Sequence, residues 1–459
     1  MKKLIIKCLL VILSLNLSLL SLGGLVKADA GSFYQMKARS AYAIDAESGQ
    51  VLYEKNAQKT YPVASVTKIL TLAVIEQDIR AHKLSWDQKI TASPAVAQMA
   101  NDPRCSNVQL NAGEKYTVKQ LVESMMLVSA DGSTEALALA DAGSTAAFNK
   151  KMQAVAHKAG VDDAKVYNMV GLPNSYMGAH ALKGVNKDAE NLFSAKDIAL
   201  ISKYLIEKYP ETLQITSTKF ADFDVSADHK EHMTNINSLL PQNGAAPKDW
   251  QIDGLKTGNT DEAGKCIVST GTYAGRRVIV VALHTDGDWN DQSKMQKEFY
   301  EALSNGYQPV ALNSIKAFPK KLQQRHVVHA RKQHSTGLAL TKKTAIWLPK
   351  NTSWAQTSPQ LQLAKKHQSM TGQLEAPLTK GEQVGWIKLQ PAGMPEAKVP
   401  VQVTKTIQKT FFQGIAKAPQ TRDWDAELLL MLKTCLVFNV PLNGVGLFFT
   451  WVEVNVAEL

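Results

Sequence analysis

The 459-residue sequence has only four cysteines and none of the cysteine and histidine patterns that are typical of metal sites. No CxxC or HExxH motif occurs, so a metal enzyme has little support. Cys8 belongs to an N-terminal apolar run. The other three, Cys105, Cys266 and Cys435, cannot all pair within one chain. Cys266 lies among β-branched residues, which favours a small buried side chain over a reactive thiol.

The first thirty residues have the composition of an export signal. Lys2, Lys3 and Lys7 precede the apolar run, and Ala28-Asp29-Ala30 places small residues where a signal peptidase cleaves. We therefore predict a cleaved signal peptide at residues 1–30 and an exported mature chain. An uncleaved anchor helix is the alternative, because a run of about twenty residues nearly spans a bilayer.

Acidic residues are scarce in the C-terminal part of the chain. Residues 306–424 hold 18 Lys and Arg against 4 Asp and Glu, a net charge of +14. Residues 31–305 hold 29 against 32, a net charge of −3. Outside the cell such a basic surface fits anionic lipid head groups and wall polymers, and we expect no nucleic-acid partner. A basic face that is merely solvated is the alternative.

The spacing of apolar residues predicts an α+β domain over residues 31–305. Residues 41–53 indicate a hairpin at a sheet edge, and residues 266–285 indicate a second, longer hairpin. Between them, helical spacing begins at Ser65 and recurs over residues 118–140, with a short break at Ser129. Helices packed on an antiparallel sheet are the architecture that this order favours.

Beyond this domain the residue composition of the sequence changes. Short runs of Val, Ile and Trp, broken by Gly, Pro and Lys, predict a small all-β domain over residues 306–404. A tail follows at residues 405–459. Its residues 405–417 place Ile and Phe on one face beside lysines, which is typical of an amphipathic helix at a membrane surface. Residues 425–459 are apolar but too interrupted for a good transmembrane helix.

Three short motifs occur in order and carry the chemistry: Ser65-Val66-Thr67-Lys68, Ser129-Ala130-Asp131 and Lys256-Thr257-Gly258. Each is weak alone, and a lone SxxK is as well explained as an exposed helix start. Their joint order, at a helix start, an interhelical loop and a strand, is much harder to obtain by chance.

The spacing of the first motif has a chemical reason. Residues i and i+3 share a helix face, so the Lys68 amine can lie against the Ser65 hydroxyl. A serine needs a neighbouring base to become a nucleophile, and a lysine can act as that base only if its pKa is lowered. Burial and a second cation, for which Lys256 is the candidate, both lower the pKa of a lysine.

These motifs resemble the SxxK, SxN and KTG motifs of the penicillin-recognising serine enzymes. The flanking segments PVASVTKILT, MLVSADGSTEALALA, VGLPN, FSAKDIA and DGLKTGNTDEAGKC are similar to the low-molecular-mass D-alanyl-D-alanine carboxypeptidases over roughly residues 40–305. The β-rich part and tail match that family in layout only. The resemblance implies a β-lactamase/transpeptidase-like catalytic domain that removes the terminal D-alanine from peptidoglycan stem peptides and binds β-lactam antibiotics covalently, without a cofactor.

The resemblance also implies a role for each catalytic position. Ser65 would attack the carbonyl between two D-alanines, and Lys68 would be its base. Ser129 would relay a proton to the departing D-alanine. Lys256 and Thr257 would hold the terminal carboxylate of the substrate.

The remaining positions of the implied site are main-chain groups and one departure from the family pattern. The backbone N–H groups of Ser65 and Asn259 would form an oxyanion hole. Gly258 would keep the strand free of a side chain, so that the substrate can lie against it. Asp131 stands where the SxN motif has asparagine, and an ionised carboxylate, unlike an amide, cannot donate a hydrogen bond.

Three other kinds of protein could have parts of this sequence pattern. A serine β-lactamase would have the same motifs, but the ExxLN element of the class A enzymes is absent. A non-catalytic wall-binding protein could keep the fold. An esterase on the same fold would cleave simple esters without preferring a D-alanine terminus.

Overall fold

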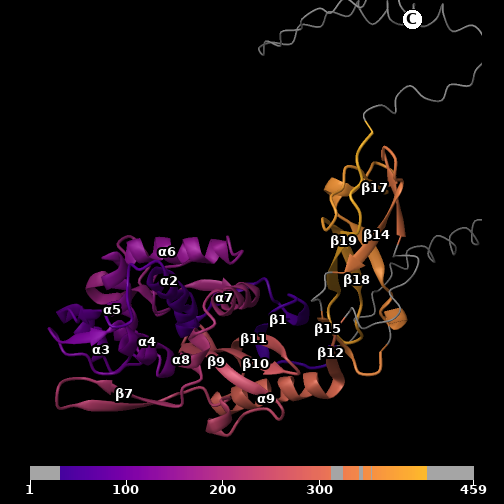
Figure 1. Ribbon diagram of the computed structural model, residues 1–459. Helices are drawn as coiled ribbons and strands as arrows, with labels where there is room; N and C mark the ends of the chain where they lie inside the picture. Colours follow the sequence, from indigo (N-terminus) through magenta and orange to yellow (C-terminus); the bar gives the residue numbers. More distant parts are fainter. Residues whose placement is uncertain (1–31, 312–323, 341–344, 353, 411–459) are drawn as a thin grey trace, which may run out of the picture. The chain divides into compact units, whose positions relative to one another are not determined.

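The computed structural model describes residues 32–311, 324–340, 345–352 and 354–410, so the expected signal peptide and most of the expected tail lie outside the described residues. Within them, helices pack on a five-stranded sheet, and a part built mainly of strands follows (Figure 1). The predicted α+β domain followed by a small all-β part is confirmed.

The main sheet is antiparallel, with the strand order β2-β1-β11-β10-β9. Both predicted hairpins are present, and the N-terminal one reaches the edge of the sheet. The strands are β1 (Ala38–Asp45), β2 (Val51–Lys55), β9 (Gln251–Thr260), β10 (Gly264–Tyr273) and β11 (Arg276–Thr285). Three two-stranded ribbons accompany it: β3 (Thr60–Pro62) with β6 (Leu192–Ser194), β4 (Lys89–Thr91) with β5 (Lys115–Thr117), and β7 (Phe220–Asp224) with β8 (Lys230–Thr234).

Helices lie on both sides of the main sheet, and Figure 1 shows α7 and α9 on opposite faces. Several begin with a capping box, as at Thr117 and Gln120, which satisfies the first free N–H groups of the helix. The helices are α2 (Lys68–Arg80), α3 (Pro94–Ala100), α4 (Val118–Leu127), α5 (Asp131–Ala142), α6 (Thr145–Lys158), α7 (Ala195–Lys208), α8 (Thr212–Thr216) and α9 (Trp289–Gly306), with 3-10 turns η1 (Ala64–Thr67), η2 (Asn174–His180) and η3 (Pro241–Asn243).

The sequence of strand β11 explains why both faces of the main sheet are covered by helices. Its buried residues alternate: Ile279 and Val281 join the core formed with α2 and α7, whereas Val278 and Val280 join the core that contains Phe299 of α9. Successive side chains of a strand point to opposite faces, so an apolar run of this kind requires apolar cover on both. The sheet therefore forms the rigid centre on which the helices are placed.

The C-terminal part has its own apolar core, which includes Val327, Ile387 and Val399. Its six-stranded sheet has the order β16-β18-β19-β14-β13-β17, and β12 pairs separately with β15. The elements are β12 (Tyr307–Ala311), β13 (Gln324–Val328), β14 (Ser335–Leu340), β15 (Ala345–Pro349), β16 (Gln360–Leu363), β17 (Leu374–Glu375), β18 (Gln383–Leu389) and β19 (Ala397–Val403), with 3-10 turns η5 (Trp354–Thr357) and η6 (Lys365–His367).

The predicted amphipathic helix is wrong where the structure describes it. Ile407 is buried in the core of the β-rich part and forms a β-bridge with Leu378, and Lys409 bridges to Ala330. The apolar residue that suggested a membrane face thus packs against strands instead. The rest of the expected helix, from residue 411, lies outside the described residues. Across the part of the chain that the structure describes, we find no helix with the length and hydropathy to cross a membrane.

Candidate active site

The first motif lies where η1 runs directly into α2. Ser65 is in η1 and Lys68 is the first residue of α2, so one continuous helical segment carries both. Both side chains are buried, with exposed fractions of 7% and 0%. The Lys68 ammonium donates a hydrogen bond of 2.6 Å to the Ser65 Oγ. The predicted contact across one helix face is therefore present.

The second motif lies in the short connection between α4 and α5. Ser129 has a φ of +67°, a left-handed conformation that is uncommon for a residue with a side chain, and Asp131 begins α5. Asp131 Oδ1 lies 2.6 Å from the Lys68 Nζ, and both groups are buried. Ser129 Oγ lies at 3.4 Å from the same nitrogen, and the Val170 carbonyl lies at 3.3 Å. Lys68 is thus the centre of a buried polar cluster.

Asp131 is fixed by the backbone as well as by Lys68. Its Oδ2 accepts a hydrogen bond of 3.0 Å from the Ser106 N–H, and its own N–H donates to the Ser106 carbonyl at 2.7 Å. A carboxylate with an N–H donor on one oxygen and an ammonium on the other is satisfied as an anion. The aspartate in place of the family's asparagine therefore forms a buried ion pair.

The third motif lies on β9, which packs against η1. Lys256 is 2% exposed, and its Nζ donates to the Thr257 carbonyl at 2.8 Å. Burial and the positive charge of Lys68 hold the pKa of Lys256 well below its usual range, while Asp131 acts in the opposite direction. The repulsion that we expected between the two lysines therefore lowers the pKa of Lys256, whereas Lys68 has a carboxylate partner.

Gly258 has a structural reason to be glycine that the sequence did not indicate. A Cβ at this position would lie 2.8 Å from the Ser65 nitrogen and 2.9 Å from the Val66 nitrogen. Both are backbone atoms, which cannot move aside as a flexible side chain can. Glycine thus makes room for the backbone of η1, and it allows β9 to lie directly against the segment that carries Ser65.

The three motifs meet at one cleft of about 530 Å³. Ser65, Ser129, Thr257, Gly258 and Asn259 all line it. The other three predicted positions, the two lysines and the aspartate, are buried beside it, with exposed fractions of 0–2%. The structure therefore brings all eight predicted site residues together.

The sequence did not point to several other groups around this cleft. Ile236 and Trp289 line it with exposed fractions of 50% and 45%, which is unusual for large apolar side chains. In the sequence, only the polar residues around these two positions could have indicated that their side chains are exposed. The Val170 carbonyl and the Ser106 N–H are main-chain groups, which no residue type reveals, although Val170 lies in the VGLPN segment that carries the family resemblance.

The described part of the chain contains no group of three His, Cys, Asp or Glu side chains suited to a metal ion. The predicted burial of Cys266 is confirmed, since it is fully buried in β10. That burial raises the pKa of its thiol to about 12, which disfavours the reactive thiolate.

Comparison with known proteins agrees with these observations. Residues 26–287 match the D-alanyl-D-alanine carboxypeptidase family of serine peptidases. The chain is 26% identical over 388 residues to D-alanyl-D-alanine carboxypeptidase DacF of Bacillus subtilis, an alignment covering 84% of this chain and 90% of that protein. It is 29% identical over 400 residues to DacC of Escherichia coli, covering 84% and 87%.

Solved structures show the same fold along most of the chain. Penicillin-binding protein 5 of Haemophilus influenzae has a TM-score of 0.62 at 23% identity, covering 82% of this chain and 98% of that one. PBP3 of Streptococcus pneumoniae, titled a peptidoglycan synthesis regulatory factor, has a TM-score of 0.60 at 26% identity, covering 82% and 100%. The resemblance found in the motifs is therefore confirmed: the chain belongs to the D-alanyl-D-alanine carboxypeptidase family and is a serine hydrolase of the penicillin-binding class.

Proposed function

We propose that this enzyme removes the terminal D-alanine of a peptidoglycan stem peptide through an acyl-enzyme on Ser65. One observation carries the proposal: the Lys68 Nζ lies 2.6 Å from the Ser65 Oγ, at the wall of an open cleft. This is hydrogen-bonding distance between a nucleophile and its base. Uncharged Lys68 takes the hydroxyl proton while the serine oxygen bonds to the carbonyl carbon between the two D-alanines.

Binding of the substrate is assigned to β9. Lys256 and Thr257 hold the terminal carboxylate, because an ammonium and a hydroxyl on the cleft strand are donors for an anion. The backbone N–H groups of Ser65 and Asn259 stabilise the negative oxygen of the tetrahedral intermediate. Gly258 supports this arrangement indirectly, since it lets β9 and η1 approach each other closely.

The acyl-enzyme forms when the C–N bond breaks, and the leaving amine needs a proton. Ser129 relays that proton from Lys68, whose Nζ lies 3.4 Å from the Ser129 Oγ. Water then adds to the ester, and the bond to Ser65 breaks to release the shortened peptide. A penicillin acylates the same oxygen, but its leaving group stays attached, so the adduct persists.

We also propose that the enzyme works outside the cytoplasm, with a signal peptide at residues 1–30, a catalytic domain at 31–305 and a β-rich domain at 306–404. The tail at 405–459 would meet the membrane surface. Because Ile407 packs within the β-rich core, the membrane-binding residues belong after Thr410.

Mass spectrometry of the intact protein tests the proposal. Incubation with benzylpenicillin should add the mass of one antibiotic molecule to the wild type and none to Ser65→Ala, and only the wild type should release D-alanine from a D-Ala-D-Ala peptide. Lys68→Ala should lose nearly as much activity, because residues that act as a unit are not additive. Ser217→Ala, outside the cleft, is the matched control. Rapid turnover of the penicillin would favour a β-lactamase, and persistent labelling of Ser65→Ala would exclude Ser65 as the nucleophile.

A further inference from the structure

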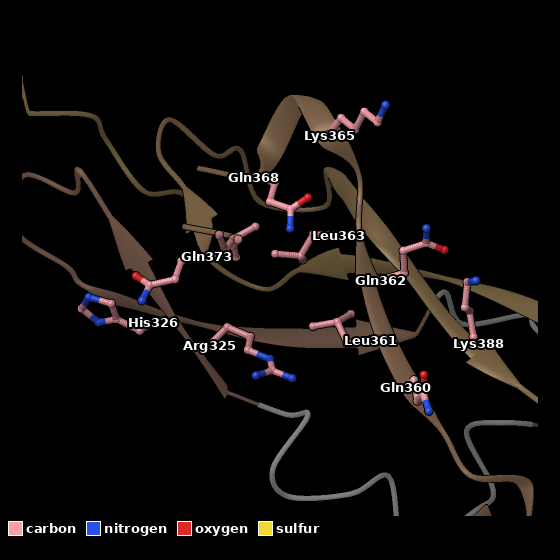
Figure 2. Close-up of a pocket in the computed structure, with 12 residues that line it drawn as sticks. Arg325, His326, Gln360, Leu361, Gln362, Leu363, Lys365, Gln368, Gln373 and Lys388 are labelled. Atoms are coloured by element: carbon pink, nitrogen blue, oxygen red, sulfur yellow. The ribbon is translucent and has the colours of Figure 1, made fainter. Parts of the chain in front are cut away.

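The β-rich part contains a groove of about 750 Å³ that is separate from the catalytic cleft (Figure 2). Its twelve lining residues come from β13, β16, β17, β18, η6 and the turns that join them. Figure 2 shows Arg325 and Gln373 on one side and strand β16 on the other. All four residues of β16 line the groove, so its whole length borders the opening.

Strand β16 presents an unpaired edge to this groove. Within the described residues it ends the strand order of its sheet and pairs only with β18. Backbone groups of an antiparallel strand point alternately toward and away from the partner. Since the Ala364 N–H bonds to the Val384 carbonyl on β18, Leu361 and Leu363 direct their N–H and C=O groups away from it.

Strand β16 is short and follows Pro359, but inside it no charged side chain, proline or bulge blocks that edge. Natural sheets usually protect a free edge with a charged side chain, a proline or a bulge inside the strand. Gln360–Leu363 reads Gln-Leu-Gln-Leu and has none of the first two, and its pairing with β18 is regular. Leu361 and Leu363 are partly buried against the core, so they leave apolar surface for the side chains of a guest strand.

The side chains around the groove favour a negatively charged ligand. None of the twelve lining residues is acidic, while Arg325, His326, Lys365 and Lys388 are basic. Lys388 is already paired with Glu396 at 3.2 Å. The buried Arg325 Nε has no hydrogen-bond partner among the described residues, and a buried N–H without a partner is costly. Arg325 as a whole is only half-buried, so a carboxylate from a ligand can still pair with the charge of its guanidinium.

We propose that this groove binds an extended acidic peptide segment of a partner protein, added as a strand to β16 with a carboxylate on Arg325. A peptide is favoured over an anionic wall polymer because only a peptide backbone matches the outward N–H and C=O groups of Leu361 and Leu363. A second copy of this chain is disfavoured, since it would bring Arg325 and Lys365 against their own like charges. The proposal is independent of the catalytic assignment.

Fluorescence anisotropy with a labelled peptide of alternating Glu and Val tests it on the full chain. Binding should weaken at least tenfold when Gln replaces Glu in the peptide, and equally when alternate peptide nitrogens are methylated so that they cannot pair. Arg325→Gln should lose at least tenfold, whereas Arg331→Gln, which removes one positive charge outside the groove, should change little. Hydrogen exchange at Leu361 and Leu363 should slow in the complex.

Four outcomes would overturn the proposal. The first is no detectable peptide binding. The second is equal binding of the methylated peptide or of inorganic polyphosphate, which would show a site for anionic polymers. The third is an equal loss in Arg331→Gln, which would show a diffuse effect of positive charge. The fourth is a concentration-dependent dimer in sedimentation that Arg325→Gln strengthens, which would make a second copy the occupant.

Discussion

Replacing Asp131 with asparagine tests how the buried ion pair sets the proton balance of the site. In the proposed mechanism Lys68 must be uncharged to take the Ser65 proton, yet Asp131 Oδ1 lies 2.6 Å from its Nζ and stabilises the charged form. Asp131→Asn removes that charge and keeps an oxygen that can accept a hydrogen bond. The neutral amine should therefore be present at lower pH, and acylation should be faster near neutrality.

The size of the effect follows from the strength of the ion pair. Two charges about 4 Å apart in an effective dielectric of 20 interact by about 4 kcal/mol, and about 1.4 kcal/mol corresponds to one pH unit. The amide retains part of the interaction, so we expect the acid limb of the acylation rate to move to lower pH. At neutral pH the rate should rise by up to about tenfold.

Acylation by a chromogenic β-lactam, measured in stopped flow from pH 4 to 10, would give the two profiles. Glu135→Gln is the matched control, because it removes another buried carboxylate from the same helix, one that is paired with His180 at 2.9 Å instead of with Lys68. Its acid limb should not move. Superimposable profiles for Asp131→Asn and the wild type would refute the reasoning. A lower rate at every pH would instead mean that Asp131 itself accepts the Lys68 proton during catalysis.

Three further predictions concern other parts of the chain. Ser65→Ala should abolish penicillin labelling while leaving the melting temperature within a few degrees, because only the attacking oxygen is lost. Gly258→Ala should lower the acylation rate at least a hundredfold and cost about 1–3 kcal/mol of stability, because its Cβ collides with the η1 backbone; Gly306→Ala, where a Cβ meets nothing within 4 Å, should do neither. A chain that ends at Thr410 should leave the membrane fraction and stay active, whereas one that ends at Thr404 should also be less stable, as measured by thermal unfolding, since it lacks Ile407.

The catalytic part of the fold could be predicted because local signals and global packing agree there. The apolar run of β11 requires cover on both faces, and the helical spacing after Ser65 supplies part of that cover. The order of the three motifs then placed each on the right kind of element. Contacts between distant segments could not be predicted, such as the approach of β9 to η1 that gives Gly258 its role.

The tail shows the opposite case, in which a local pattern was misleading. Ile407 beside lysines fits an amphipathic helix, but the same residue also fits a short extended segment that closes a β-core. Periodicity over so few residues cannot separate the two. Packing against Leu378 in the core of the β-rich part stabilises the extended conformation of Ile407. The Asp131 position was different again, because the sequence shows a carboxylate in place of an amide, but its pairing with Lys68 depends on geometry.

The lowered pKa of Lys256 should separate substrate binding from catalysis on the alkaline side. In the proposed mechanism its charged form holds the substrate carboxylate, so the free enzyme should lose affinity as the pH rises through that lowered pKa, and kcat/KM should fall. A bound carboxylate favours the charged form again, so kcat should persist to higher pH. Lys256→Arg carries a guanidinium that stays charged, and it should remove the alkaline limb of kcat/KM even if its kcat is lower. Steady-state release of D-alanine from a D-Ala-D-Ala peptide, measured from pH 6 to 11, gives both parameters. If kcat and kcat/KM fall at the same pH in the wild type, or if the limb survives in Lys256→Arg, then the alkaline limb belongs to another group and Lys256 does not control binding by its charge.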